Sequence, residues 1–470
     1  MRTFFRFFFN KDNILILIFT AVVAFIIQSI NLNLDALNPI EKMFGDFDIT
    51  DMYFHGIRNV KEDFQNDNTK KGNEDSNKGL DLKSGIGNDN IVVVGIGKLS
   101  RQDLIPLLEI VNAQKPKCIG IDALFKKFRT DSLNAPIDSA FGQTLQKIEN
   151  LVMVTDISFK NNTNQKVINN EIEDPQFDSL ITSHPFFIKN AKNGMANLIT
   201  GGTRDKALRS DLAGGLATCR SFSPKEKVNG KTELAFAVQL AMLYDSKKTE
   251  KFLKRNNDVE FINYIGHHEK FGYVPYQQVF EMAEANAKEE LKRLLHGKIV
   301  LMGFTGEDIN IMNVTSDEDR FFTPLNENYV GKADKDMYGI HVHANILSMI
   351  LNEDYIDTMP DWANYLITFI IAYIVTALFV FLHAKLDFWY DGLSLLVQFL
   401  LSISIVFAIL QVFDKFKMKV DWSLGFLAIV FIPNLVEVYY GAVTKLYERR
   451  QKLRRLKNKQ VATLGVEEQN

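Results

Sequence analysis

Three apolar segments crowd the last third of this chain of 470 residues, and a fourth lies near its start. The three C-terminal segments are residues 362–382, 393–413 and 422–442, and the N-terminal one is residues 14–30. Each C-terminal segment reaches the ~20 mostly apolar residues that a helix needs to cross a bilayer, and the N-terminal one is near the lower limit. The pattern predicts four transmembrane helices, one N-terminal and three C-terminal, with residues 31–361 as one large domain in water.

The N-terminal segment has the features of an uncleaved anchor. Residues 1–13 contain three basic side chains, which suit either an anchor or a signal peptide. A cleaved signal peptide ends in a small-x-small motif, but residues 28–32 read Gln-Ser-Ile-Asn-Leu and offer none. We therefore expect residues 14–30 to remain in the membrane, with a cleaved signal peptide as the alternative.

Basic residues near the end of the chain indicate the orientation. Cytoplasmic flanks of membrane helices carry an excess of Lys and Arg. The tail, residues 443–470, contains eight such residues between positions 445 and 459. We therefore expect both termini in the cytoplasm and the large domain in the periplasm, as for a multi-pass protein of a bacterial inner membrane. Three lysines in the loop 414–421 oppose this orientation, and the longer basic tail outweighs them.

Buried strands alternate with amphipathic helices along the large domain. Residues 91–96, 118–121 and 298–303 are short apolar runs bounded by turn residues, which is typical of strands buried on both faces. Residues 103–114 have the apolar spacing of a helix, and a strand–helix–strand order implies a right-handed crossover within a parallel sheet. The sequence therefore predicts an α/β domain with a mostly parallel sheet. Further helices are expected at 139–148, 232–244, 276–296 and 341–351, and further strands at 151–155 and 259–264.

Residues 61–90 interrupt this pattern. They are rich in Asn, Asp, Lys, Gly and Ser and poor in apolar side chains, so we predict a disordered insertion. Because its charges are of mixed sign, we expect no nucleic-acid partner. The two cysteines, Cys118 and Cys219, are expected to be buried thiols, with a disulfide as the alternative in an oxidising compartment.

No cofactor or metal motif is complete. Gly95-Ile96-Gly97 follows a predicted strand, but Ser100 stands where a dinucleotide fingerprint has its third glycine. His341 and His343 form an HxH pair, yet positions i and i+2 of a helix do not share a face. We therefore predict no cofactor, no metal site and no catalytic residue.

Asp122 is a candidate binding residue because of its position. It lies where a buried strand ends, and ligands of open α/β sheets bind in the crevice beyond such ends. A helix cap or a loop-stabilising aspartate is the alternative role.

A series of short motifs between about residues 48 and 362 resembles the CHASE type-two domain, an extracytoplasmic sensory domain of bacterial receptors. In order, the motifs are Asp51-Met52-Tyr53-Phe54, residues 91–97, Gly120-Ile121-Asp122-Ala123-Leu124-Phe125, Gly194-Met195-Ala196-Asn197-Leu198 with residues 205–209, Asn263-Tyr264-Ile265-Gly266, residues 297–303, Thr323-Pro324 and Gly339-Ile340-His341-Val342-His343-Ala344-Asn345. That family typically has one N-terminal helix, a periplasmic α/β sensor and three further helices. The resemblance thus implies the same arrangement as the apolar segments.

Motif matching, together with the strand-end position, leads to five ligand-binding candidates: Asp122, Asn197, Arg209, Tyr264 and His343. Two departures from the family affect what they imply. Ile265 stands where the family has an arginine, which weakens the case for an anionic ligand at that point. Family receptors also usually carry a cyclase, kinase or phosphatase domain after the third helix, and residues 443–470 are too few for one.

These observations predict a non-enzymatic membrane sensor or signal-transducing protein. We expect its periplasmic domain to bind a small ligand or an envelope protein, and a protein partner or a second copy of the chain to relay the signal. A structural or scaffold subunit of an envelope complex is the alternative, and an extracytoplasmic hydrolase using Asp122 with His343 is a minor one. The lipid bilayer is the one partner that the sequence itself identifies.

Overall fold

A computed structural model describes residues 11–29, 48–58, 89–158, 167–168, 171–172, 179–200, 218–306, 319–326, 335–386 and 389–467. The chain divides into two compact units. One is Pro39–Asp357, and the other combines Met1–Asn38 with Thr358–Asn470. Most of the predicted insertion, residues 61–88, and the candidate Arg209 lie outside the described residues.

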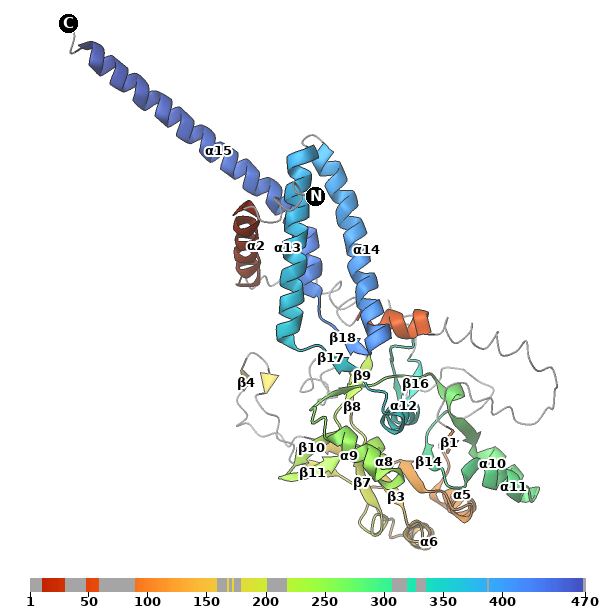
Figure 1. The fold of residues 1–470 in the computed structure, drawn as a ribbon. Coiled ribbons are helices and arrows are strands. Elements are labelled where there is room, and N and C mark those ends of the chain that lie inside the picture. The colour runs from red at the N-terminus through yellow and green to blue at the C-terminus, as the bar shows by residue number, and fades with distance from the viewer. Residues whose placement is uncertain are drawn as a thin grey trace, which may run out of the picture. The chain divides into compact units, whose positions relative to one another are not determined.

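A mostly parallel sheet forms the centre of the first unit (Figure 1). Its parallel strands lie in the order β13, β1, β14, β2, β3, β7, and β6 pairs antiparallel with β3. The strand bounds are β1 Ile91–Gly95, β2 Cys118–Asp122, β3 Leu151–Ser158, β6 Ser179–Ile181, β7 Lys192–Met195, β13 Gly272–Pro275 and β14 Ile299–Gly303. Every residue of β1 and β14 is buried, which confirms that these apolar runs are strands covered on both faces.

Four helices cover one face of the sheet. They are α5 (Arg101–Ala113), α6 (Asn134–Gln146), α10 (Tyr276–Glu284) and α11 (Lys288–Leu295). Alternate strand residues such as Val94, Ile119 and Met302 join Leu107 of α5 and Leu294 of α11 in one buried apolar cluster. The connections from β1 to β2 and from β2 to β3 therefore both run over this face.

Two helices, α8 (Phe236–Tyr244) and α12 (Gly339–Asn352), pack on the opposite face. Glycines in the strands allow this close packing. A Cβ on Gly120 of β2 would lie 2.6 Å from a methyl carbon of Leu240, and one on Gly303 of β14 would lie 2.9 Å from Ile340. Helix α9 (Ser246–Leu253) follows α8.

Short antiparallel pairs complete this unit. Strands β8, β9 and β12 form one small sheet, and the hairpin β10–β11 turns at Asn229-Gly230, where both residues have positive φ as a two-residue hairpin turn requires. The bounds are β4 Val167–Ile168, β5 Glu171–Ile172, β8 Leu198–Thr200, β9 Cys219–Phe222, β10 Lys225–Val228, β11 Lys231–Leu234, β12 Glu260–Phe261, β15 Arg320–Phe321 and β16 Met337–Tyr338. Single helical turns lie at η2 Tyr53–Arg58 and η3 His268–Lys270.

Several sequence predictions in this unit are wrong in their bounds. The helix expected at 139–148 runs from Asn134 to Gln146, and the strand expected at 151–155 continues to Ser158. The helix expected at 232–244 begins only at Phe236, because Lys231–Leu234 pairs with β10. The helix expected at 276–296 is two helices, because Asn286 between them has a left-handed φ of 58°. The strand expected at 259–264 is limited to Glu260–Phe261.

The second unit contains the apolar helices. They are α2 (Lys11–Ser29), α13 (Asp361–Leu386), α14 (Tyr390–Phe416) and α15 (Ser423–Glu467), with the short strand β18 (Met418–Lys419) between the last two; β17 (Asp357–Thr358) precedes α13. Among the described residues, three segments are long and apolar enough to cross a membrane: Asp361–Leu386, Tyr390–Phe416 and Leu424–Val443. The three predicted C-terminal apolar helices are thus confirmed. Helix α2 packs against α13 and α15, but its crossing of the membrane stays a prediction.

Candidate ligand-binding edge of the sheet

The connections on either side of β14 leave the sheet in opposite directions. Strands β1 and β2 lead into α5 and α6 on one face, whereas β14 between them leads toward α12 on the other face. In open α/β sheets, ligands bind in the crevice that such a reversal leaves beyond the carboxyl ends of the strands. The carboxyl ends of β1, β14 and β2 are therefore the place to look for a site.

Glycines bring the loops close together on the β1 side of this edge. A Cβ on Gly95 would lie 2.3 Å from Thr305 Oγ1, and that hydroxyl is 3.1 Å from the Tyr273 hydroxyl. A neighbouring pocket of about 360 Å³ is lined by Gly97, Lys98, Leu99, Ser100, Asp103 and Tyr276. Its volume is in the range of small-molecule sites. None of these six residues was a sequence candidate, although Gly95-Ile96-Gly97 after a strand was the signal that could have indicated them.

A carboxyl pair lies on the β2 side of the same edge. Asp122 is the last residue of β2, and the charge of Asp319 acts on it. Burial raises the pKa of Asp122, and the like charge of Asp319 raises it further; burial also raises the pKa of Asp319. The Asp319 carbonyl accepts a hydrogen bond of 2.9 Å from the N–H of Gly339, the first residue of α12. Within the described part of the chain, no cationic side chain compensates Asp122.

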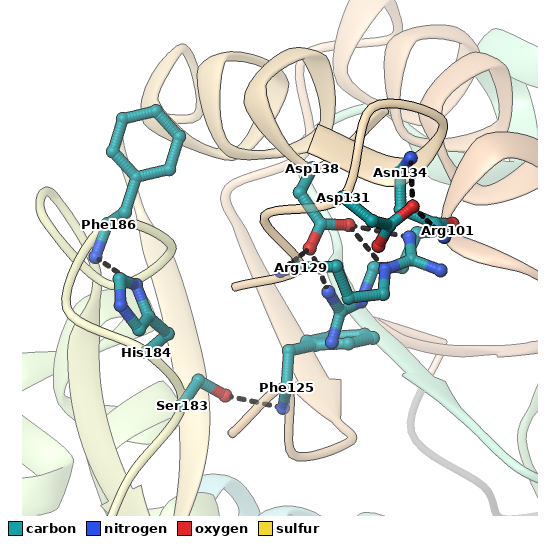
Figure 2. A network of polar contacts seen from close by, with 9 residues as sticks. All are labelled: Arg101, Phe125, Arg129, Asp131, Asn134, Asp138, Ser183, His184 and Phe186. Carbon is teal, nitrogen blue, oxygen red and sulfur yellow. Dashed lines mark hydrogen bonds and ion pairs between the residues drawn. The ribbon is translucent and has the colours of Figure 1, made fainter. Parts of the chain in front are cut away.

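A second carboxyl in the same β2–α6 connection has the opposite environment (Figure 2). Asp138 of α6 is fully buried and accepts hydrogen bonds from Arg101 Nη1 at 2.5 Å and from Arg129 Nη2 at 2.6 Å. The backbone N–H of Arg129 donates to it as well, at 2.7 Å. Burial by itself would raise the pKa of Asp138, but the bonds from Arg129 and Arg101 outweigh burial and hold it at about 2. This carboxylate therefore fixes the loop that follows Asp122.

Aromatic rings surround the Asp138 ion pairs. The Arg101 guanidinium lies 5.5 Å from the centre of the Phe125 ring and 5.1 Å from that of Phe187. The N–H of Phe125 donates to Ser183 Oγ at 2.9 Å, which joins the loop to the segment around His184, as Figure 2 shows. Cation–π contacts and hydrogen bonds thus hold one wall of the edge rigid.

Among the described residues, no hydrogen bond or ion pair joins Asn197, Tyr264 or His343 to Asp122. Asn197 connects strand ends: its Oδ1 accepts from the N–H of Ile157 at 2.9 Å, and its Nδ2 donates to Asp156 at 2.5 Å. Tyr264 is fully buried, and its hydroxyl donates to the Cys219 carbonyl at 2.8 Å. These contacts give both residues a structural role, and their role in ligand binding stays a prediction.

His343 is buried between α12 and α8. Its ring meets the Phe236 ring edge-on at 5.2 Å, and burial lowers the pKa of His343 to about 4, which keeps it neutral. In the part of the chain that the structure describes, no hydrogen bond joins His343 to Asp122.

Cys118 and Cys219 are free thiols. Both are buried, and burial raises the pKa of each to about 12. The prediction of buried thiols is therefore confirmed, and the alternative of a disulfide is wrong. Across the described ranges, no three His, Cys, Asp or Glu side chains are grouped as a metal site would need.

Comparison with known proteins gives one match. The family described as the CHASE2 domain matches residues 82–380, which contain the whole sheet, Asp122, Asp138, Asp319 and most of the first of the three C-terminal apolar helices. No curated protein and no solved structure matches the chain.

Proposed function

Since this chain belongs to the CHASE2 family of sensor domains, we propose that it is a non-enzymatic membrane sensor that binds a small ligand at the carboxyl edge of its sheet. The observation that carries the proposal is Asp122. Its carboxyl lies at the end of a central strand, next to a second carboxyl and without a cationic partner in the described residues. Perturbed groups of this kind concentrate at functional sites.

A ligand at this edge would improve the environment of Asp122. A group that donates a hydrogen bond or carries positive charge would stabilise the carboxyl, which the protein itself leaves uncompensated. Binding shifts a conformational equilibrium only by the difference in affinity between the two states. The site combines Asp122, Asp319 and the first turn of α12. A change in the spacing of the two carboxyls would alter their repulsion, and the two conformations would then differ in their affinity for the ligand.

The proposed topology places the sensor domain in the periplasm and both termini in the cytoplasm. One contact supports it: the hydroxyls of Tyr439 and Tyr440, at the end of the last apolar segment, donate to Asp12 at the start of α2, at 3.3 and 3.2 Å. The start of α2 and the end of the last apolar segment therefore lie at the same end of the helix bundle. An even number of crossings follows if α2 spans the membrane.

The signal would leave through α15. This helix continues without a break from its apolar part, Leu424–Val443, to Glu467, so a rotation or shift in the membrane would reach the basic tail. We infer that a cytoplasmic protein or a second copy of the chain reads that movement.

Thermal-shift screening of the purified full-length protein tests ligand binding. The library would contain amino acids, polyamines, sugars, nucleotides and dicarboxylates. We expect at least one class to raise the melting temperature of the wild type and to lose that effect in Asp122→Asn or Tyr276→Leu. The matched control is Glu109→Gln, which removes one exposed carboxylate from α5.

Two outcomes would contradict the proposal. A hit that stabilises Asp122→Asn and Tyr276→Leu as much as the wild type would bind elsewhere. No hit, together with a stoichiometric envelope protein that co-purifies in mild detergent, would favour the scaffold alternative.

Labelling with a membrane-impermeant maleimide tests the topology. The native cysteines are buried, so an introduced cysteine dominates the signal. We expect Lys126→Cys, at an exposed position of the large domain, to react once the outer envelope is permeable, and Lys445→Cys to react only after the inner membrane is opened. The reverse pattern would invert the proposed orientation.

A further inference from the structure

A buried polar cluster joins the two ends of the sensor unit. Arg58 Nη1 donates to Asn263 Oδ1 at 3.0 Å and to the Tyr264 carbonyl at 2.5 Å. Asn263 Nδ2 in turn donates to the Asp354 carbonyl at 3.2 Å. These partners are separated by 205, 206 and 91 positions in the sequence, so the contacts come from the tertiary fold.

Helix α12 binds the next two residues of the same loop, Ile265 and Gly266, through Asn345. Its Oδ1 accepts from the N–H of Ile265 at 2.8 Å, and its Nδ2 donates to the carbonyls of Gly266 at 3.1 Å and His341 at 2.9 Å. Asn345 is fully buried, and its amide is satisfied at both ends. A fully connected buried network is rigid and specifies one arrangement. Arg58, Asn263, Tyr264, Asn345 and the Asp354 carbonyl are called the clamp below.

The clamp lies where the chain enters and leaves the sensor unit. Arg58 closes the segment 48–58, which follows α2 in the sequence, and Asp354 lies between the end of α12 and the start of α13. A second contact fixes the first of these segments, because Arg220 Nη2 donates to Asp51 at 2.6 Å. Both segments through which the sensor unit continues into the helical unit are therefore bonded to one loop, Asn263-Tyr264-Ile265-Gly266.

The other end of α12 lies at the candidate ligand edge. Its first residue, Gly339, meets the Asp319 carboxyl, which would lie 2.9 Å from a Cβ at that position, and the next residue, Ile340, packs on Gly303 at the end of β14. Asn345 lies less than two turns further along the same helix. A displacement of the first turn of α12 is thus carried to the clamp by a short, continuous helix.

We propose that the clamp is a coupling element, which makes the two chain ends of the sensor unit move together with α12. The coupling between the chain ends stands on the contacts above alone, whereas its control by a ligand rests on the proposed function. Arg58 and Asn345 are positioning residues in this device, since neither is placed at the ligand edge.

Hydrogen–deuterium exchange of the full-length protein in detergent tests the coupling. Arg58→Met removes the hydrogen bonds from Arg58 to Asn263 and to the Tyr264 carbonyl and keeps the length of the side chain. We expect exchange about tenfold faster in peptides covering residues 259–267 and also in those covering 350–357, with β1 and β14 unchanged. Reciprocally, Asn345→Asp, which cannot donate to Gly266, should accelerate exchange in residues 48–58.

Arg129→Met is the matched control. It removes a comparable arginine from Asp138, so exchange should rise around residues 125–138 and stay unchanged at 350–357. If Arg58→Met does not fold, Arg58→Lys, which keeps the charge and one donor group, replaces it and should give the same pattern with smaller amplitude.

Confinement of the Arg58→Met effect to residues 48–58 would overturn the proposal, because the two chain ends would then be independent. So would an Asn345→Asp effect confined to residues 259–267. Faster exchange at both ends, combined with no ligand in the thermal-shift screen, would leave the clamp in place and remove the sensing role.

Discussion

Asp122 lies at the end of β2 and Asp138 lies in α6, the next helix, and the two carboxyls differ in the charge of their neighbours. Burial acts on both carboxyls and by itself raises the pKa of each. Arg101 and Arg129 reverse that effect at Asp138, whereas Asp122 has Asp319 beside it and no cation in the described residues. The charge of the neighbouring side chain, more than the depth of burial, therefore separates a structural carboxylate from one with unused binding capacity.

The same contrast explains why the two residues tolerate change differently. Removing one member of a buried ion pair leaves the other charge uncompensated, which is strongly destabilising. Removing a carboxyl that repels its neighbour relieves a strain instead. Substitution of each aspartate by its isosteric asparagine therefore tests the comparison directly, and the expected effects have opposite signs.

Asp138→Asn has the larger expected effect. The neutral amide leaves Arg101 and Arg129 without their carboxylate. Because the Arg129 side chain is 37% exposed, water screens part of the loss, and we expect destabilisation of about 2–4 kcal/mol. For a domain of this size, that lowers the melting temperature by about 5–10 °C, measured on the full-length protein in detergent.

Acid provides an independent check on Asp138. Its pKa is lowered in the folded protein, so its contribution is present above the ordinary carboxyl value and is lost as the pH falls from about 4 toward 2. Asp138→Asn should flatten the stability curve in that window, and Glu109→Gln is the control for the loss of one exposed carboxylate. A variant as stable as the wild type at neutral pH would show that the ion pairs contribute nothing.

Much of the fold could be predicted from the sequence, because its strongest patterns are local. The apolar runs at Ile91–Gly95 and Ile299–Gly303 are short, uninterrupted and bounded by turn residues, and a strand covered on both faces is the structure that suits them. The three C-terminal apolar helices follow from length and hydropathy alone. Asp122 could be placed at an edge of the sheet because it directly follows such a run.

The environment of Asp122 could not be predicted in the same way. Asp319 lies far from it in sequence, and nothing in the residues around Asp319 indicates that its charge acts on Asp122. The same holds for Arg101 and Asp138, which are 37 positions apart, and for Arg58 and Asn263, which are 205 apart. The motif around Asn345 was recognised by its resemblance to a family, but its contacts with Ile265 and Gly266 exist only in the folded chain.

Asp122→Asn has the smaller expected effect, and its sign is opposite to that of Asp138→Asn. Since the pKa of Asp122 is raised in the folded protein, the carboxyl stabilises the fold at low pH, and this contribution is lost as the pH rises above the ordinary carboxyl value of ~3.9. The neutral amide does not lose a proton, so the variant should be about 1–2 kcal/mol more stable than the wild type near pH 8 and nearly equal to it near pH 4. Thermal melts of both proteins across this range measure the difference, with Glu109→Gln as the control for the loss of one exposed carboxylate. Lower stability of Asp122→Asn at every pH would mean that the carboxylate has a compensating partner, and Asp122 would then belong with Asp138 as a structural residue and lose its place in the proposed site.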